Sequence, residues 1–159
     1  MILDERTEFA DDVAVTVTAD VTNNIGDQIP LSVARDLGTP GSDASGMQIV
    51  FQVTEAFTSG GAATVAFQVA SDASAAIAVD GSQSVHVRSK VFSMAELALG
   101  AEVVLNVVPE STAEPYELFL GVQAVKAGGA ALTAGKVNAF LTRDTGRRGK
   151  VYASPSQYV

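Results

Sequence analysis

The chain of 159 residues fits a single domain, because most domains contain about 100–150 residues. Hydrophobic residues make up 47 % of it but charged residues only 18 %, against roughly 25 % in an average soluble protein. With no Cys and a net charge of −8, the composition excludes a disulfide scaffold, a Cys-ligated metal protein and a binder that neutralises nucleic-acid phosphates. So few charges also indicate that part of the surface is covered by a partner.

The charges gather at the two ends of the chain with opposite signs. Residues 1–20 hold six acidic residues and Arg6, a balance of −6 + 1 = −5, whereas residues 136–150 hold five cations and Asp144, a balance of +5 − 1 = +4. Such ends are typical of interaction segments, although two solvated termini explain them equally well. The first residues lack the basic and apolar regions of a secretory signal, and no apolar run approaches a membrane span of about 20 residues.

In the first half of the chain, hydrophobic residues mostly alternate with polar ones. Residues 12–19 place Val13, Val15 and Val17 on one face, which predicts a half-buried strand, and residues 29–33 indicate a weaker one. Residues 46–57 and 64–70 predict two further strands around Gly60-Gly61, so we expect them to form a β-hairpin. The glycine-rich segment 38–46 is typical of a loop.

The second half continues this pattern. Strands are predicted at residues 85–88, 102–108, 117–126 and 135–142, with hairpin turns at Asp80-Gly81 and Gly128-Gly129. Short helices are compatible with residues 1–10 and 93–99. About eight strands with this punctuation predict an antiparallel all-β sandwich or barrel.

Residues that could carry chemistry are scarce. His86 is the only histidine and lies inside an alternating strand, so we expect an outward-facing side chain rather than a catalytic base. One histidine cannot supply a zinc or cupin-type metal site, and Asp11, Asp12, Asp72 and Asp80 lack calcium-loop spacing, which favours turn carboxylates. The glycine pairs lack the lysine of a phosphate loop. By elimination we expect a binding module without enzymatic activity and without a cofactor.

Several short motifs, in order along the chain, resemble the Bbp16-type capsid cement proteins of tailed bacteriophages. They are Ile2-Leu3-Asp4 with Phe9-Ala10-Asp11, Ile25-Gly26-Asp27 with Ala34-Arg35-Asp36-Leu37-Gly38, Phe51-Gln52-Val53-Thr54, the segment from Thr58 to Val65, Ser71-Asp72, the segment from Ala75 to Ser82, Leu120-Gly121, and the segment from Leu132 to Thr142. The resemblance implies a jelly roll that decorates the outside of a head built from an HK97-like major capsid protein, bridges its subunits and has no catalytic residues. The loop at 38–46 and the tail after Thr142 differ most from this pattern.

Together these observations predict an N-terminal arm (residues 1–12), a jelly-roll domain (13–142) and a basic tail (143–159). The predicted contact residues lie in the arm and the tail: Ile2, Leu3, Asp4, Glu5, Glu8, Phe9, Arg143, Arg147, Arg148, Lys150 and Tyr152. The expected partners are the major capsid protein and other copies of this chain, as a dimer or else a trimer, with neither nucleic acid nor membrane. The expected location is the outer surface of the virion, after assembly in the bacterial cytoplasm.

Two alternatives belong to other functional classes. A carbohydrate- or receptor-binding jelly roll of a tail or spike is compatible with the fold, but such sites usually present aromatic platforms. This chain has no Trp, and two of its three tyrosines, Tyr152 and Tyr158, lie in the tail. A hydrolase with an unusual site would depend on His86.

Overall fold

The computed structural model describes residues 7–31, 47–107 and 115–142, and within these ranges it contains strands and no α-helix. The strands are β1 (Glu8–Ala14), β2 (Thr22–Pro30), β3 (Gln48–Ser59), β4 (Thr64–Asp72), β5 (Ser84–Arg88), β6 (Phe92–Ser93), β7 (Glu102–Asn106), β8 (Phe119–Ala127) and β9 (Leu132–Thr142).

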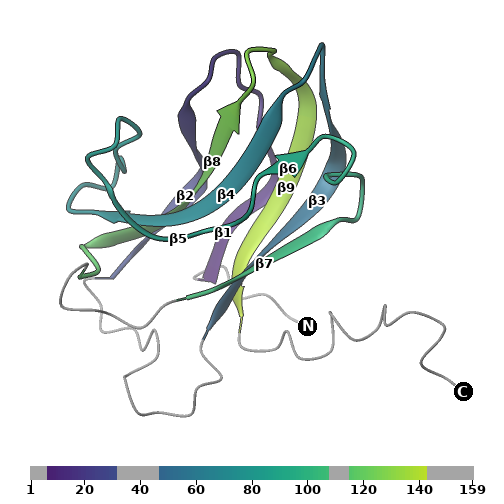
Figure 1. The fold of residues 1–159 in the computed structure, drawn as a ribbon. Helices are drawn as coiled ribbons and strands as arrows, with labels where there is room; N and C mark the ends of the chain where they lie inside the picture. Colours follow the sequence, from purple (N-terminus) through teal and green to yellow (C-terminus); the bar gives the residue numbers. More distant parts are fainter. Residues whose placement is uncertain (1–6, 32–46, 108–114, 143–159) are drawn as a thin grey trace, which may run out of the picture.

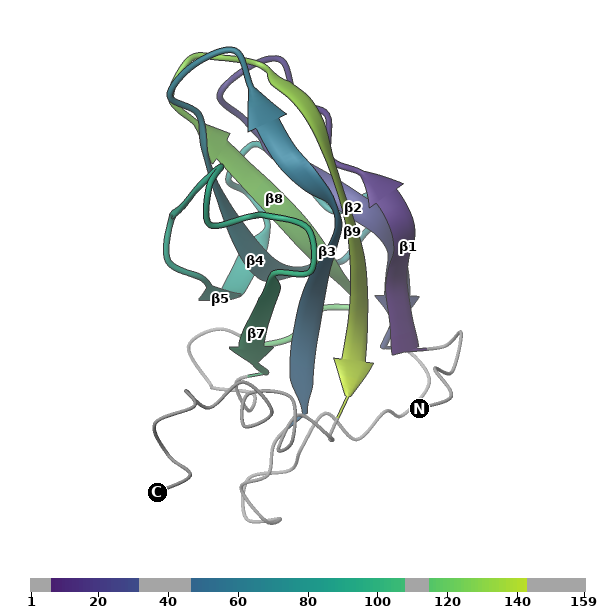
Figure 2. The same ribbon diagram turned by 90° about the vertical axis from the view of Figure 1, so that its right-hand side faces the viewer.

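These strands form two antiparallel sheets packed face to face (Figures 1 and 2). The first sheet has the order β1-β9-β3-β7, and the second has the order β2-β8-β4-β5 with β6 also paired to β4. Apart from the step through β4, β5 and β6, each consecutive pair of strands belongs to different sheets. This is the strand order of a jelly roll, so the predicted all-β jelly-roll sandwich is confirmed.

The predicted hairpin at Gly60-Gly61 is wrong. β3 pairs with β7 and β9, whereas β4 pairs with β5, β6 and β8, so the turn carries the chain from one sheet to the other. Gly128-Gly129 likewise connects β8 to β9 across the sandwich. The physical reason is that each of the two strands joined by such a turn carries a row of side chains that faces the core. These rows pack against each other, as Phe51 and Phe67 do with ring centroids 4.6 Å apart.

The first strand also differs from its predicted bounds. β1 begins at Glu8 rather than at residue 12, and Phe9 is buried in the core with 1 % of its surface exposed. The predicted arm boundary between residues 12 and 13 therefore falls inside β1. Asp12 adopts φ 51° at an irregularity in the pairing of β1 with β9, a left-handed conformation that Asp tolerates better than most residues.

Two further segments depart from local expectation. β2 runs from Thr22 to Pro30 although its sequence is rich in Asn, Gly and Asp, because pairing with β8 supplies its hydrogen bonds. Residues 93–99 form a turn rather than a helix, in which Leu97 is fully buried and its carbonyl accepts a hydrogen bond from the amide of Phe57. The predicted loop at 38–46 and the tail at 143–159 lie outside the described residues.

Candidate functional site: a terminal end and a pocket

The described chain begins and ends on adjacent strands at one end of the sandwich. Glu8 of β1 lies opposite Phe140 of β9, and Gln48 of β3 lies between Thr142 of β9 and Asn106 of β7. We call this end of the first sheet, where its four strands begin or finish, the terminal end; in Figure 2 it is the lower end of β1, β9, β3 and β7. The acidic N-terminal segment and the basic C-terminal segment therefore join the fold side by side.

An ion pair already links these two strands further along the sheet. The Lys136 Nζ atom lies 2.7 Å from Asp12 Oδ2, and Thr54 donates a hydrogen bond to Asp12 Oδ1. The hydrogen bond from Lys136, followed by that from Thr54, lowers the pKa of Asp12, and the bond to Asp12 raises the pKa of Lys136. The ion pair thus adds a surface contact to the backbone pairing that joins β1 to β9.

The predicted contact residues fall into three groups. Glu8 is half-buried at the terminal end, where a partner could reach it. Phe9 points into the core instead, so its inclusion as a surface contact is corrected: the alternation that starts at Glu8 places its ring between the sheets. The remaining predicted residues lie outside the described residues: Ile2, Leu3, Asp4, Glu5, Arg143, Arg147, Arg148, Lys150 and Tyr152.

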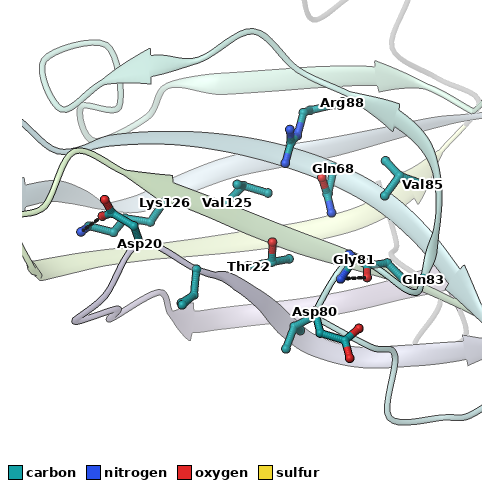
Figure 3. A pocket seen from close by; sticks show the side chains of 12 residues that line it. Asp20, Thr22, Gln68, Asp80, Gly81, Gln83, Val85, Arg88, Val125 and Lys126 are labelled. Carbon is teal, nitrogen blue, oxygen red and sulfur yellow. Dashed lines mark hydrogen bonds and ion pairs between the residues drawn. The ribbon is translucent and has the colours of Figure 1, made fainter.

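A pocket of about 560 Å³ opens on the outer face of the second sheet (Figure 3). It lies between β2, β5 and the 79–83 segment, and strands β4 and β8 form its floor. Its lining consists of Asp20, Val21, Thr22, Gln68, Val79, Asp80, Gly81, Gln83, Val85, Arg88, Val125 and Lys126. We call it the β2–β5 pocket. The sequence carries no signal for it, because its walls come from five segments whose proximity depends on the pairing of the strands.

A comparison with protein-family models decides the family. The Bbp16 family model matches residues 9–141, which is nearly the whole of the described sandwich. The chain belongs to the Bbp16 family. It is therefore a phage-related protein, in agreement with the motifs found in its sequence. A search of curated proteins gave no match.

In this Bbp16-family fold, the single histidine does not face outward as predicted. Its Nε2 atom lies 2.7 Å from the Ser71 hydroxyl oxygen, and its ring stacks on Tyr116 with centroids 3.9 Å apart. Ser71 is fully buried, and its hydroxyl accepts a hydrogen bond from the amide of Glu117. A buried hydroxyl held in this way is poorly placed to reach a substrate, so the Ser71–His86 pair acts as a link between β4, β5 and the segment that precedes β8.

Of the four acidic residues considered for calcium, Asp72 and Asp80 behave as turn carboxylates in the Bbp16-family fold, whereas Asp11 and Asp12 lie within β1, so the expectation of turn carboxylates is wrong for those two. Asp72 accepts hydrogen bonds from the amides of Ser74 and Ala78, and Asp80 accepts them from the hydroxyl and amide of Ser82. These bonds lower the pKa of both carboxyl groups. Within the described ranges, no three His, Asp or Glu side chains are grouped closely enough to hold a metal ion.

The described residues of the Bbp16-family chain also include no helix of sufficient length and hydrophobicity to span a membrane.

Proposed function

We propose that this Bbp16-family protein is a capsid cement protein that binds the outside of a phage head and bridges HK97-like major capsid protein subunits, without catalysing a reaction. The observation that carries the proposal is the terminal end, where segments of opposite charge join adjacent strands of a rigid jelly roll. Segments of opposite charge that leave the fold from adjacent strands favour one orientation on a partner that has its own charge pattern. Family membership supports the same role.

The physical basis of this role is that many copies of the protein bind the shell, and each copy adds free energy of association. A ligand that binds only the assembled shell stabilises the shell by mass action. Weak contacts combine when one protein engages two neighbouring subunits, because the second contact becomes intramolecular. A surface with few charges suits a cement protein, since few charged groups have to be desolvated when it docks on the shell.

The proposal extends to partners and location. Copies of the chain would associate with each other on the shell, with two-fold pairs favoured because closed two-fold symmetry is the commonest arrangement, and trimers as the alternative. Neither nucleic acid nor a membrane would be bound directly. The protein would join the outer surface of heads assembled in the host cytoplasm.

Deletion of each terminal segment tests the docking role. The N-terminal deletion should remove residues 1–6 and stop before β1, because loss of Phe9 would damage the core itself. The second variant should lack residues 143–152. Purified heads without the protein are incubated with each variant, and occupancy is measured by quantitative gel electrophoresis, with thermal unfolding of the free variant as the control for folding. We expect lower occupancy for both deletions, and undiminished occupancy for both would contradict the proposal.

The number of copies in each virion distinguishes cement from a carbohydrate- or receptor-binding spike module. A cement protein is expected in hundreds of copies, whereas a spike module is expected in a handful. None of the described side chains that line the β2–β5 pocket is aromatic, which disfavours a sugar site there.

A further inference from the structure

Three apolar side chains form a row across the outer face of the first sheet, two residues in from the terminal end. Val50 of β3 lies between Phe140 of β9 and Val104 of β7 in the strand register. The residues before and after each of them along the strands belong to the core, so alternation points the row away from the second sheet. Glu8 of β1 continues the row, because it pairs with Phe140. We call Phe140, Val50 and Val104 the apolar row.

The apolar row is covered on one side and open on the other. Phe140 and Val50 are 2 % and 0 % exposed, and Thr142, the next residue of β9 on the same face, is 8 % exposed. Val104 is 42 % exposed. The outer face of an antiparallel sheet is commonly open to solvent, and neighbouring strands surround its side chains only from the sides. Complete burial therefore requires a group above the sheet, and this group lies over β9 and β3 and stops before β7.

The outer face of the second sheet shows how such burial arises. Gln123 is 0 % exposed there because the 73–83 segment packs over β8, with Ile77 above Gly121 and the Ala78 carbonyl bonded to Gln123. No described segment plays this part on the first sheet. The described neighbours of Phe140 and Val50 lie beside them in the register, and in Figure 2, which looks onto this sheet, no described segment crosses β9 or β3 near the terminal end.

The cover belongs to the same chain, because these exposed fractions are those of a single chain with no second copy beside it. Residues 1–6 lead to the face from the required side, since Glu8 at the start of β1 pairs with Phe140, on the edge opposite the exposed Val104. Their length is sufficient. Strands lie about 4.8 Å apart, so β3 is about 10 Å from β1, and six extended residues reach about 20 Å.

Composition also favours residues 1–6 over the other segments outside the described ranges. They begin with Met1-Ile2-Leu3, and burial of apolar surface drives such contacts. The eight residues after Thr142 include no Val, Ile, Leu, Met or aromatic residue, and residues 41–46, before β3, include no side chain larger than that of Asp43. Residues 108–114 follow β7, on the side where the apolar row is exposed.

We propose that residues 1–6 fold back over the outer face of their own first sheet, with the apolar side chains of residues 1–3 packed on Phe140 and Val50. The outer face of β9 and β3 is thus a docking surface for the N-terminus of the same chain. This inference goes beyond the cement function and does not depend on it. It divides the predicted contact residues, because Ile2 and Leu3 contact their own sheet and leave Asp4 and Glu5 for a partner.

Thiol labelling tests the cover, because the chain has no native Cys. Val50→Cys places one thiol at the centre of the covered face, and its rate of reaction with a soluble thiol reagent is measured in the full chain and in a variant without residues 1–6. We expect the deletion to raise this rate at least about tenfold, since a covered thiol reacts only when its cover opens. Val137→Cys is the matched control, because Val137 is also 0 % exposed but faces the core from β9, so its rate should stay low in both chains.

The labelling rates also identify any other occupant. An unchanged Val50→Cys rate after the deletion would overturn the proposal, and so would an equal acceleration of Val50→Cys and Val137→Cys, which indicates general unfolding. A faster rate after removal of residues 143–152, but not of residues 1–6, would assign the cover to the C-terminal segment instead. A rate that rises on dilution of the full chain would assign it to a second copy.

Nuclear Overhauser effects in the unsubstituted protein give a second readout that does not depend on the folding of any variant. We expect cross-peaks between the methyl groups of Ile2 or Leu3 and the ring of Phe140. Their absence would overturn the proposal. Neither measurement uses phage heads, so its outcome is independent of the cement function.

Discussion

At the scale of single residues, Glu96 makes the hydrogen bonds of a helix-capping motif in a segment that does not form a helix. Ser93 and Glu96 have the spacing of a helix capping box, and the Glu96 carboxylate does accept hydrogen bonds from the amide and hydroxyl of Ser93. The chain nevertheless makes only a turn, because Leu97 is held in the core and Gly100 at φ 82° redirects the backbone toward β7.

The pKa of Glu96 provides a test of this turn. The hydrogen bond from Lys90, and after it those from Ser93, lower this pKa from 4.5 to about 2. The folded-state pKa is depressed, so the stability that it contributes is present above pH 4.5 and is lost as the pH falls through about 2. Carbon-13 NMR titration of the carboxyl group should give a midpoint near this value. In Lys90→Met the midpoint should rise toward 4.5, and an unchanged midpoint would contradict the assigned cause.

At the scale of elements, the 73–83 segment between β4 and β5 packs against the outer face of the second sheet. Ile77 is buried over Gly121 of β8, where an added Cβ would lie 2.5 Å from the Ile77 Cδ1 atom. The carbonyls of Ile77 and Ala78 accept hydrogen bonds from Asn24 and Gln123. One wall of the β2–β5 pocket is thus held by the side-chain amides of Asn24 and Gln123 rather than by strand pairing.

Replacing the central amide should loosen this segment. Gln123→Met keeps the side-chain volume but leaves the Ala78 carbonyl, the Asn24 oxygen and the amides of Gln68 and Gln83 without their partner. We expect a loss of roughly 2–4 kcal/mol in the free energy of unfolding by urea, with faster hydrogen exchange in residues 73–83.

Gln52→Met is the matched control for this substitution. Gln52 is half-buried on the outer face of the first sheet, away from Asn24 and Gln123. Its replacement should therefore change the free energy of unfolding by only about 0.5 kcal/mol, as ordinary surface substitutions do. Equal stability losses in the two variants would show that Gln123 does not hold the segment.

At the scale of the whole molecule, the two sheets approach closely where β1 and β2 meet. Gly26 of β2 has φ 60°, and a Cβ atom at this position would lie 2.0 Å from the carbonyl oxygen of Phe9 in β1. Only glycine allows the backbones of the two edge strands to come so near. This contact positions β1, and with it the acidic half of the terminal end.

Gly26→Ala should therefore separate the sheets at this edge. The left-handed backbone and the clash with the backbone of Phe9 should together cost roughly 2–4 kcal/mol, seen as a lower thermal midpoint. Gly129→Ala is the control, because Gly129 has φ 74° but no atom within 4 Å of the added Cβ, so only the conformational cost of about 1 kcal/mol applies. Equal losses in the two variants would argue against a close approach at this edge.

Much of the candidate site was not accessible to sequence reasoning. The charges at the two ends predicted interaction segments, but the register of β1 with β9 is what brings these ends together. The alternation of Val13, Val15 and Val17 predicts a strand from residue 12 and so places Phe9 in the arm, whereas β1 in fact begins at Glu8 and buries Phe9. The β2–β5 pocket gave no sequence signal, since Gln68, Val79 and Arg88 are ordinary strand or turn residues until the sheet aligns them.

The amino-acid pattern already predicts the class of fold and the position of most strands, because period-two alternation and glycine turns are local properties of the chain. It also carried the family motifs. The pairing of the strands depends on the packing of the whole fold, and the two turns expected to close hairpins are instead crossings between the sheets. The physical reason is that hydrogen bonds between strands are non-local: alternation shows which face of a strand is buried, but the packing of both faces selects its neighbour.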